Sequence, residues 1–458
     1  MLVNNPTMDK IINLCKSRGI IFAGSEIYGG MGNTWDYGPI GVEIKNNIKK
    51  VWWKRFVQEN DNAYGVDAAI LMNSRVWDAS GHTNSFSDPK MDCKKCKARS
   101  RADNLIEAHS KGKVNPDVMS NAEMEAYIEE HHICCPKCGG FDWTPIRQFN
   151  LMFETSRGII EGDKDKIYLR PETAQGEYVN FLNVQRSMRA KVPFSIAQIG
   201  KSFRNEVTPG NFIFRTIEFE QMEHQLFCKE GTDQEYYDLY KQKAFKFLTD
   251  IGFNPEHLRF KDHDKLAHYA KSACDIQFLY PIGWQELNGI HNRTNYDLSR
   301  HQEFSGKSML YLDPITNEKY IPYVVEYSIG ADRLMLAVLC EAYHEEQLEN
   351  ETRVVLKLHP CLCAYKCAIL PLMKKNHSEK ALEIYHELSK YFMCEFDDSG
   401  SIGKRYRRND EIGTPYCITV DDETLNNGTV TIRDRDTMEQ IVVKVEELKN
   451  YILDKIFV

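Results

Sequence analysis

The chain has 458 residues, of which 42% are hydrophobic and 27% are charged, and its formal net charge is −8. A chain of this length and composition is expected to form two or three globular domains with substantial cores. The negative charge excludes a general affinity for nucleic acid, so any RNA contact must come from local basic patches.

The sequence also argues against a membrane-bound or secreted protein. The longest uninterrupted apolar run, Leu334–Cys340, is far shorter than a helix that spans a bilayer, and no apolar signal region opens the chain. The fourteen cysteines are mostly scattered, which is typical of a reducing compartment. We therefore expect a cytoplasmic protein.

The first expected elements are a glycine-rich turn and a long helix. The spacing of Gly29, Gly30 and Gly32 matches neither a P-loop nor a dinucleotide fingerprint, which favours a plain turn. Pro39 then opens a helix, because proline is tolerated in a first helical turn and apolar residues follow at helical spacing. The apolar face of this helix predicts core packing.

A cysteine-rich segment follows between residues 86 and 150, with a charged helical stretch at its centre. Its paired cysteines are Cys93, Cys96, Cys135 and Cys138. Two C-x₂-C knuckles have the geometry of a tetrahedral, structural zinc site. The gap between the pairs is longer than in a compact ribbon, and Cys134 is a competing ligand, so reduced cysteines without metal are the alternative.

The central part of the chain predicts a long antiparallel hairpin. Two runs of β-branched and aromatic residues, Phe194–Ile199 and Phe212–Leu226, flank a polar loop. Polar and charged residues gather where the arms meet this loop: Arg204, Asn205, Glu206, Arg215, Glu218, Glu220 and Glu223. The planar fork of arginine suits phosphate, whereas a surface hairpin held by salt bridges would use the same residue types.

Three further stretches place a charged residue beside a strand or a helix. Glu172 lies where a strand end turns into a helix, and Glu286 follows the expected strand Asp275–Tyr280, where an acidic residue suits Mg²⁺. After the expected strand Tyr323–Tyr327, a Ser-Ile-Gly turn leads to a helix with Arg333 in its first turn. An anionic ligand explains a cation there better than the helix dipole does.

The composition shifts near residues 349–353, and strand–helix alternation then predicts a C-terminal α/β domain. Its expected strands are Lys366–Leu372, Glu395–Asp397, Tyr416–Val420 and Thr429–Arg433. A last amphipathic helix is expected through Ile441, Val445, Leu448 and Ile452. The basic segment 404–408 mixes cations with an aromatic residue, as contacts to single-stranded RNA do, although a solvated helix face is the alternative.

Several of these stretches together resemble the class II aminoacyl-tRNA synthetases. The run F-R-N-E, a loop and F-R-T-x-E-F-x-Q-M-E, which begins beside Arg204, resembles motif 2 as glycyl-tRNA synthetases carry it. The run E-Y-S-I-G-A-D-R, which ends at Arg333, resembles motif 3. The helix after Pro39 resembles motif 1, which implies a homodimer. R-P-E-T-A-Q-G, R-A-D-N-L-I-E and G-W-Q-E-L-N-G-I are similar to further runs of the glycyl family.

The resemblance implies an α+β fold, in which helices flank an antiparallel catalytic sheet. The implied domains are 1–85 (the N-terminal part of the catalytic domain, with motif 1), 86–150 (the Cys-rich insertion), 151–348 (the catalytic core, with motifs 2 and 3) and 353–458 (the anticodon-binding domain).

The resemblance also assigns the site residues. The implied catalytic residues are Arg204, Arg333 and Glu286. ATP would be bound by Arg204, Asn205, Glu206, Phe214, Arg215, Thr216, Phe219, Glu286, Leu287, Gly330, Ala331, Asp332 and Arg333. Glycine would be bound by Arg101, Glu172, Phe219, Glu220, Gln221, Met222, Glu223, Glu326, Ser328 and Gly330. tRNA would be bound by Lys404, Arg405, Arg407 and Arg408.

The implied activity is that of a glycine–tRNA ligase, which uses ATP and Mg²⁺ to form glycyl-adenylate and then charges tRNA(Gly). Such chemistry needs positioning and charge neutralisation rather than a covalent nucleophile. Because glycine has no side chain, selectivity must come from excluding a methyl group. A rigid pocket is therefore expected, with acidic residues that hold the ammonium group.

Three alternatives stay open at this point. Another class IIa synthetase, for threonine, proline, histidine or serine, would share the fold. A non-catalytic relative, such as the DNA polymerase accessory subunits built on this scaffold, would have no need to keep Arg204, Glu206, Glu286 and Arg333 together, and this chain has all four. A zinc-ribbon adaptor with an unrelated body would leave the hairpin chemistry unexplained. The central expectation is that these two arginines meet in one cleft.

Overall fold

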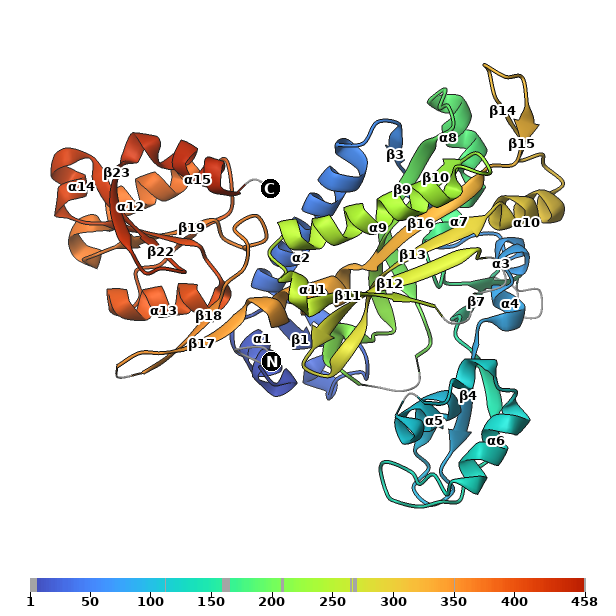
Figure 1. The fold of residues 1–458 in the computed structure, drawn as a ribbon. Coiled ribbons are helices and arrows are strands. Elements are labelled where there is room, and N and C mark those ends of the chain that lie inside the picture. The colour runs from blue at the N-terminus through green and yellow to red at the C-terminus, as the bar shows by residue number, and fades with distance from the viewer. Residues whose placement is uncertain are drawn as a thin grey trace.

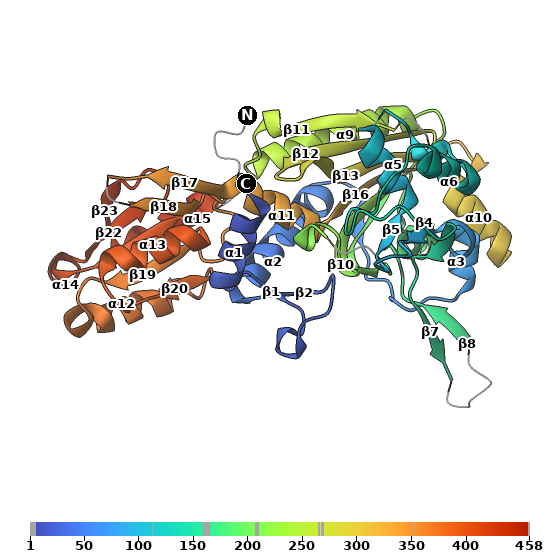
Figure 2. The same cartoon turned by 90° about the horizontal axis from the view of Figure 1, so that it is seen from below.

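The computed structural model describes residues 6–111, 113–158, 165–206, 210–263, 266, 270–349 and 351–456. Figure 1 shows a central sheet with its helices, a small cysteine-rich body at one end and a C-terminal sheet body at the other. Seen from below, the C-terminal body lies to the left and the cysteine-rich body overlaps the right-hand part of the central body (Figure 2). None of the helices in the described ranges combines the length and the apolar character that crossing a membrane requires.

The central sheet has seven strands in the order β11-β12-β13-β16-β10-β9-β3. In chain order these strands are β3 (Ala63–Gly65), β9 (Phe194–Phe203), β10 (Glu218–Cys228), β11 (Leu258–Asp262), β12 (Ser272–Tyr280), β13 (Gly283–Thr294) and β16 (Tyr323–Gly330). All neighbours are antiparallel except β3 and β9, which are parallel. The expected antiparallel sheet is confirmed.

The β9–β10 hairpin is present, but its second arm begins later than the sequence predicts. The strand was expected from Phe212, whereas β10 begins at Glu218. Residues Phe212–Phe214 form a 3₁₀ turn, and both Asn211 and Phe212 have positive φ. The three apolar side chains of this turn are buried in the main core, so core burial explains the apolar run that alternation assigned to a strand.

Helices cover both faces of the central sheet. One face carries α2 (Pro39–Trp53), α9 (Asp233–Asp250) and α11 (Ala331–Ala342), which share the main core with the sheet. The predicted helix after Pro39 is confirmed, with Ile44, Ile48 and Trp52 fully buried. The other face contacts α7 (Ala174–Val179) and α10 (Tyr296–Ser305). The cleft described below opens on this second face.

Two boundaries near the expected site also differ from the prediction. The strand that was expected to stop at Tyr327 continues to Gly330, so α11 follows it without the expected turn. Glu286 does not follow a strand end, because it lies inside β13, which pairs with β12 as a hairpin. Both differences place more of the predicted residues on strands, where alternation decides which face they occupy.

The small body is a three-stranded sheet, β5-β4-β6, packed against two helices. Its elements are β4 (Ser87–Asp92), β5 (Arg99–Arg101), α5 (Ala102–Ser110), α6 (Asn121–Glu130) and β6 (Arg147–Asn150). Strand β4 is the central strand: it pairs with β5 on one side and with β6 on the other. It therefore holds the two ends of the insertion together.

The C-terminal body is a five-stranded sheet in the order β20-β19-β21-β22-β23. Its elements are β19 (Cys367–Pro371), α12 (Lys374–Leu388), β20 (Cys394–Phe396), α13 (Ile402–Ile412), β21 (Tyr416–Val420), α14 (Asp422–Asn427), β22 (Thr429–Asp434), β23 (Gln440–Lys444) and α15 (Leu448–Ile456). The expected last helix is too long: Ile441 lies in β23, and the helix begins only at Leu448. The β-branched run before Lys444 pairs with β22 instead.

The remaining elements connect these bodies. The helices are α1 (Met8–Ser17), α3 (Arg75–Ser80), α4 (His82–Ser85) and α8 (Phe181–Ser187). The strands are β1 (Ile21–Ala23), β2 (Trp35–Tyr37), β7 (Glu154–Arg157), β8 (Asp165–Tyr168), β14 (Tyr311–Leu312), β15 (Lys319–Tyr320), β17 (Tyr343–Gln347) and β18 (Thr352–Leu356). The expected boundary near residues 349–353 falls in the β17–β18 hairpin, which leads into the C-terminal body.

Candidate active site

One cleft collects residues that are far apart in the sequence, and both Arg204 and Arg333 line it. Its other lining residues are Glu172, Glu206, Ile213, Phe214, Arg215, Thr216, Phe219, Gln221, Glu223, Glu286, Leu287, His291, Arg293, Glu326, Ser328, Ile329, Gly330 and Asp332. The expectation that the two arginines share a cleft is therefore met.

The register of the sheet brings the acidic residues of the cleft together. Glu223 on β10 pairs with Ser328 on β16, which pairs with Gly289 on β13. In the next row, Glu326 on β16 pairs with His291 on β13. Directly paired residues occupy the same face of a sheet, so these side chains all face the cleft.

Arg204 follows β9, and its guanidinium group lies over two aromatic rings. Its guanidinium carbon lies 5.2 Å from the ring centre of Phe86 and 5.4 Å from that of Phe219. Its Nε donates a hydrogen bond of 3.0 Å to the carbonyl of Pro171. Contacts with two rings and one hydrogen bond restrict the rotamers of this side chain, so its planar fork is held in one orientation.

Arg333 enters the cleft from the first turn of α11. Its guanidinium lies 4.6 Å from the ring centre of Phe214, and its Nε donates to the Phe214 carbonyl at 3.2 Å. A terminal nitrogen is 3.1 Å from Glu286, whose side chain is 52% exposed. The charge of Arg333 lowers the pKa of Glu286. A pair this exposed contributes little to stability, so a ligand can separate it at small cost.

The remaining residues of the expected ATP site lie around these arginines with varied exposure. Glu206 forms an ion pair of 3.4 Å with Arg215. Thr216 and Leu287 are buried and line the cleft. The described lining does not include Asn205, which is exposed, or Ala331, which is fully buried.

Glu326 lies at the acidic end of the cleft and has several partners. It accepts hydrogen bonds from His291 Nδ1 at 2.7 Å and from Gln225 at 3.0 Å. Arg293 lies 3.3 Å away. Burial alone would raise the pKa of Glu326, but Arg293 and His291 outweigh burial and lower the pKa to about 2. Glu326 is therefore a carboxylate at neutral pH.

Glu172 is a second carboxylate of this end. Its oxygens lie 3.3 Å from His82 and 3.0 Å from the amide of Gln175. Burial again acts against the charged form, but His82 and Arg293 together lower the pKa of Glu172 well below its usual range. This acid therefore keeps its charge although its side chain is only 16% exposed.

Glu223 differs from its two neighbours because it lacks a cation of its own among the residues described. It accepts hydrogen bonds from Thr173 at 2.5 Å and Gln221 at 3.0 Å, and it is 3% exposed. Burial, together with the charges of Glu326 and Glu172, raises the pKa of Glu223 to about 8. At neutral pH this group is a protonated acid that a cationic ligand would ionise.

Three residues of the expected glycine site face away from the cleft or lie outside it. Met222 and Glu220 have the opposite strand parity to Glu223: Met222 is buried in the main core, and Glu220 pairs with Lys45 at 2.8 Å. Arg101 lies in the insertion, where it pairs with acidic residues of the same body. Strand alternation, which separates these residues, could have excluded Met222 and Glu220 from the site.

Asp332 borders the cleft but serves as an anchor. Its carboxylate accepts from Lys45 Nζ at 2.8 Å and from the backbone N–H of Glu220 at 2.7 Å, and the hydroxyl of Tyr37 also donates to it. These bonds join α2, β10 and the start of α11. They hold Arg333, the next residue, at a fixed place above the sheet.

The sequence analysis missed four residues that contact the acidic end: His82, Thr173, His291 and Arg293. Two of them had a usable signal. His291 and Arg293 continue the alternation of β13 beyond Gly289, and both line the cleft, although the pairing with β16 shifts register at Arg293. The helix that carries His82 is far away in the sequence, so no local pattern links it to Glu172.

The four cysteines of the insertion form a compact cluster. The Sγ atoms of Cys93 and Cys138 are 3.6 Å apart, those of Cys96 and Cys135 are 3.7 Å apart, and all four lie within 4.8 Å of one another. The backbone N–H of Cys96 contributes most to lowering the pKa of Cys93 to about 7. This all-sulfur donor set and spacing fit a tetrahedral Zn²⁺, and Cys134 is not part of the cluster.

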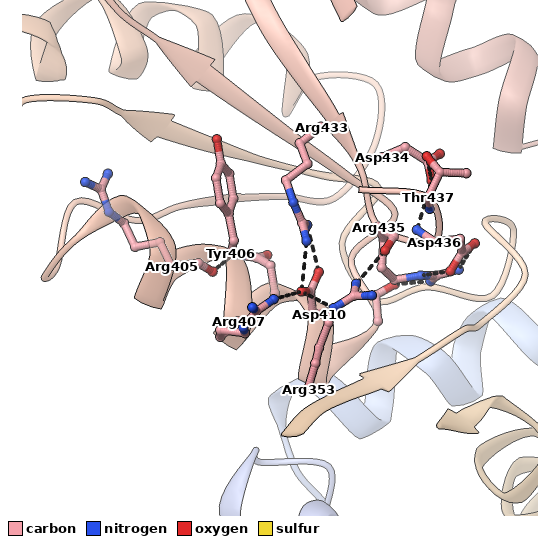
Figure 3. Close-up of polar contacts among 12 residues, drawn as sticks. Arg353, Arg405, Tyr406, Arg407, Asp410, Arg433, Asp434, Arg435, Asp436 and Thr437 are labelled. Carbon is pink, nitrogen blue, oxygen red and sulfur yellow. Dashed lines mark hydrogen bonds and ion pairs between the residues drawn. The ribbon is translucent and has the colours of Figure 1, made fainter. Parts of the chain in front are cut away.

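The basic segment of α13 is largely neutralised. Figure 3 shows Arg353, Arg407 and Arg433 directed at Asp410, and the first and third of these arginines lie 2.8 and 2.9 Å from it. Arg405 is 3% exposed and donates to the carbonyls of Pro371 and Asp397.

A groove still runs along this helix, and its lining includes Lys404, Arg407 and Arg408 but not Arg405. Arg407 pairs with Glu351 at 2.5 Å, and Arg408 pairs with Asp397. Lys404 has no ion pair among the residues described and is exposed. Of the four cations expected to contact RNA, it is therefore the one whose charge is most available.

Comparison with known proteins follows the same division of the chain. The family model for the tRNA synthetase class II core domain (G, H, P, S and T) matches residues 153–342, and the model for the anticodon binding domain matches residues 366–455. A crystal structure titled as the RNA binding domain of threonyl-tRNA synthetase from Cryptosporidium parvum Iowa II covers 98% of both chains with a TM-score of 0.66. At 15% identity, this match supports the fold alone.

The sequence relatives are much closer. Proteins named glycine–tRNA ligase from Clostridium kluyveri and Bacillus cereus are 58% and 55% identical, and the alignments cover 98% of this chain and 98% and 99% of theirs. The protein of the same name from Clostridium perfringens is 59% identical, with 97% of each chain covered. The unrelated-body alternative is thereby excluded, and the predicted fold and family are confirmed. The chain belongs to the glycine–tRNA ligases, a family of class II aminoacyl-tRNA synthetases.

Proposed function

We propose that this enzyme attaches glycine to the 3′ end of tRNA(Gly) in two steps, through glycyl-adenylate. The observation that carries the proposal is that Arg204 and Arg333 line the same cleft as a group of buried carboxyl groups. Arginine forks suit the phosphates of ATP, and buried acids suit an ammonium group. A cleft with both features side by side suits ATP next to a small amino acid.

In the first step, the carboxylate of glycine attacks the α-phosphorus of ATP, and pyrophosphate leaves. We assign Arg204 to the α-phosphate because its fork is already oriented by Phe86 and Phe219. A fixed cation stabilises the charge that develops in the transition state without reorganising. We assign Arg333 to the other end of the triphosphate. The further ATP contacts are assigned to Glu206, Phe214, Arg215, Thr216, Leu287 and Gly330.

Glu286 is the residue that we assign to Mg²⁺. Its carboxylate is half exposed and lies beside Arg333, and a hard oxygen ligand with room for water suits this ion. When bound, Mg²⁺ neutralises phosphate charge and helps to orient the triphosphate. Glu286 would hold it, while Arg333 exchanges its carboxylate partner for phosphate oxygens.

The acidic end of the cleft would bind the ammonium group of glycine. We assign this contact to Glu223, with Glu172, Glu326 and Ser328 around it. Arg293 and His291 already compensate Glu326, whereas Glu223 has no such partner in the described part of the chain. A bound ammonium would supply the missing charge and leave little space for a side chain.

The outer bodies would support tRNA binding and stability. We propose that residues 353–458 bind the anticodon region of tRNA(Gly), with Lys404, Arg407 and Arg408 along the groove of α13. We assign a structural Zn²⁺ to Cys93, Cys96, Cys135 and Cys138, which would hold the 86–150 insertion together. Residues 1–85 and 151–348 would then form the catalytic domain.

We also propose that the enzyme acts as a homodimer in the cytoplasm. The helix α2, which resembles motif 1, would contribute to the subunit contact, and Val42 on this helix is 39% exposed. None of the fourteen cysteines, all of which lie in the described ranges, forms a disulfide, which suits a reducing compartment. Sedimentation of the purified protein tests the dimer: a monomer at micromolar concentration contradicts it.

The decisive test is ATP–pyrophosphate exchange with each of the twenty amino acids in turn, without tRNA. We expect exchange with glycine and at most about a tenth of that rate with alanine or serine, because an extra methyl group must be accommodated in a rigid pocket. Equal rates with alanine or serine would contradict the assignment of glycine. Charging of a tRNA(Gly) transcript with radiolabelled glycine then tests the second step.

A further inference from the structure

Two histidines and an aspartate form a cluster at the edge of the cleft, and only one of the three, the histidine that contacts Glu326, has a role in the steps above. His263 follows β11, Asp275 lies on β12 and His291 lies on β13. One ligand atom from each lies within 4.8 Å of the other two. In the described part of the chain, the only other group with such spacing is the four-cysteine cluster.

The register of three strands explains how these side chains meet. His291 pairs with Ala273, and the backbone N–H of His263 donates to the carbonyl of Ala273 at 3.0 Å. The two histidines therefore flank one small residue on the same face of the sheet. Asp275 pairs with Gly289 in the adjacent row, so its carboxylate lies next to both imidazole rings.

Gly289 leaves the space in which these atoms converge. A Cβ at this position would lie 3.3 Å from Nε2 of His291 and 3.7 Å from Oδ1 of Asp275. It would also lie 2.9 Å from Cε1 of His291, which is too close for a side chain. On the other side, Nε2 of His263 lies 2.9 Å from Oδ1 of Asp275. Three donor atoms thus surround one small space.

The ring of His291 is already oriented as a metal ligand would be. Its Nδ1 lies 2.7 Å from Oε1 of Glu326. A hydrogen bond from Nδ1–H to this carboxylate leaves the lone pair on Nε2, which faces the cluster. A carboxylate behind a histidine ligand is the usual arrangement at metal sites, where it fixes the tautomer and increases the basicity of the ring.

We propose that His263, Asp275 and His291 bind a divalent transition metal ion, with Zn²⁺ the best match. Two imidazole nitrogens and one carboxylate oxygen suit such ions far better than Mg²⁺, which prefers oxygen ligands alone. Three protein ligands leave a coordination position for water or for an oxygen of a bound ligand. The ion would join β11, β12 and β13 and would position His291 against Glu326.

The test is metal stoichiometry, which does not depend on activity. The purified protein is loaded with Zn²⁺, dialysed against metal-free buffer and analysed by mass spectrometry. We expect two zinc ions per chain, one of which is lost in His263→Ala and in Asp275→Asn. His257→Ala is the matched control, because His257 also pairs with a carboxylate, Glu341 at 2.8 Å, but belongs to neither of the metal-spaced groups found in the described residues.

Cobalt spectroscopy of the unmodified protein gives an independent readout. After chelation and dialysis, titration with Co²⁺ should fill a thiolate site with intense charge-transfer absorption and a second site without it. The second component should be absent in Asp275→Asn. One metal per chain in the wild type, unchanged in His263→Ala, would overturn the proposal and leave His263 and Asp275 as a plain ion pair.

Discussion

The acidic end of the cleft and the basic helix α13 both carry several charged groups, but they balance them differently. On α13, Asp410 is contacted by three arginines, and Arg405 donates to two backbone carbonyls. In the cleft, three carboxyl groups share few cations, and the pKa of Glu223 rises to about 8 as a result. Buried charge that is matched within the protein stabilises the fold, whereas a charge imbalance indicates a place for a ligand.

The largest effect on stability is expected when the carboxylate that neutralises the buried arginines beside α13 is removed. Asp410→Asn would leave the buried Arg353 and Arg433 without their carboxylate, at a cost of about 3–5 kcal/mol in the free energy of unfolding. Urea unfolding should show this loss in the C-terminal body, while glycine-dependent pyrophosphate exchange is retained.

The matched control for this variant is Glu383→Gln, which removes an exposed pair with Lys380. For this variant we expect the free energy of unfolding to change by less than about 1 kcal/mol. Equal losses in the two variants would show that burial and multiple partners do not distinguish Asp410.

In the cleft, Arg204→Ala should lower the exchange rate by about 10²–10³-fold, since it removes a fixed donor from the transition state. Thermal unfolding should change little, because Arg204 makes one hydrogen bond to a carbonyl and stacks on two rings. Arg300→Ala is a close control: Arg300 stacks on Phe304 at 4.6 Å and donates to the Ala79 carbonyl, outside the cleft. If both variants keep full exchange activity, the assignment of Arg204 is wrong.

The third prediction concerns the pH dependence of glycine binding. With a pKa of about 8 in the free enzyme, Glu223 must lose a proton when an ammonium group binds. Affinity for glycine should therefore increase about tenfold for each pH unit from 6 to 8 and then level off. The KM for glycine in pyrophosphate exchange, measured at several pH values, reports this slope.

Glu223→Gln should remove most of this pH dependence and weaken glycine binding about tenfold or more, because the amide cannot ionise. Glu218→Gln is the control on the same strand: Glu218 has the opposite parity and is 44% exposed, so its removal should leave the slope unchanged. A wild-type affinity that is constant from pH 6 to 8 would contradict the role of Glu223.

The smallest effect is expected at the surface of α13. Lys404→Ala should weaken tRNA(Gly) binding a few-fold and reduce the salt dependence by about one counterion, without a change in melting temperature. Arg405→Ala should lower the melting temperature and leave tRNA binding and its salt dependence unchanged, since the guanidinium group of Arg405 is buried. Binding measured at several salt concentrations, together with melting curves, separates the two roles.

Much of this fold and site follows from the sequence because the signals are local. The helix after Pro39 and the paired cysteines could be located from periodicity and spacing. Arg204 and Arg333 could be placed in one cleft only through the resemblance to known motifs. No pattern within the chain relates two residues more than a hundred positions apart.

The errors arise where local preference and long-range packing compete. The apolar run from Phe212 suits a strand, but the structure buries it as a turn. Ile441 suits the face of a helix, but its β-branched neighbours pair with β22. Glu220 and Met222 were assigned by motif, although the parity of β10 places them behind the sheet. His82 approaches Glu172 only in the folded chain.

The cleft is built along a single extended strand, and this has a consequence for its tolerance of insertions. Phe219, beside Arg204, and Glu223, which we assign to glycine, are four residues apart on β10. At about 3.4 Å per residue, they are separated by about 14 Å. One inserted or deleted residue between them would change this length and turn Glu223 into the apolar core. The distance between the part of the cleft that we assign to ATP and the part that we assign to glycine therefore depends on the number of residues in one strand.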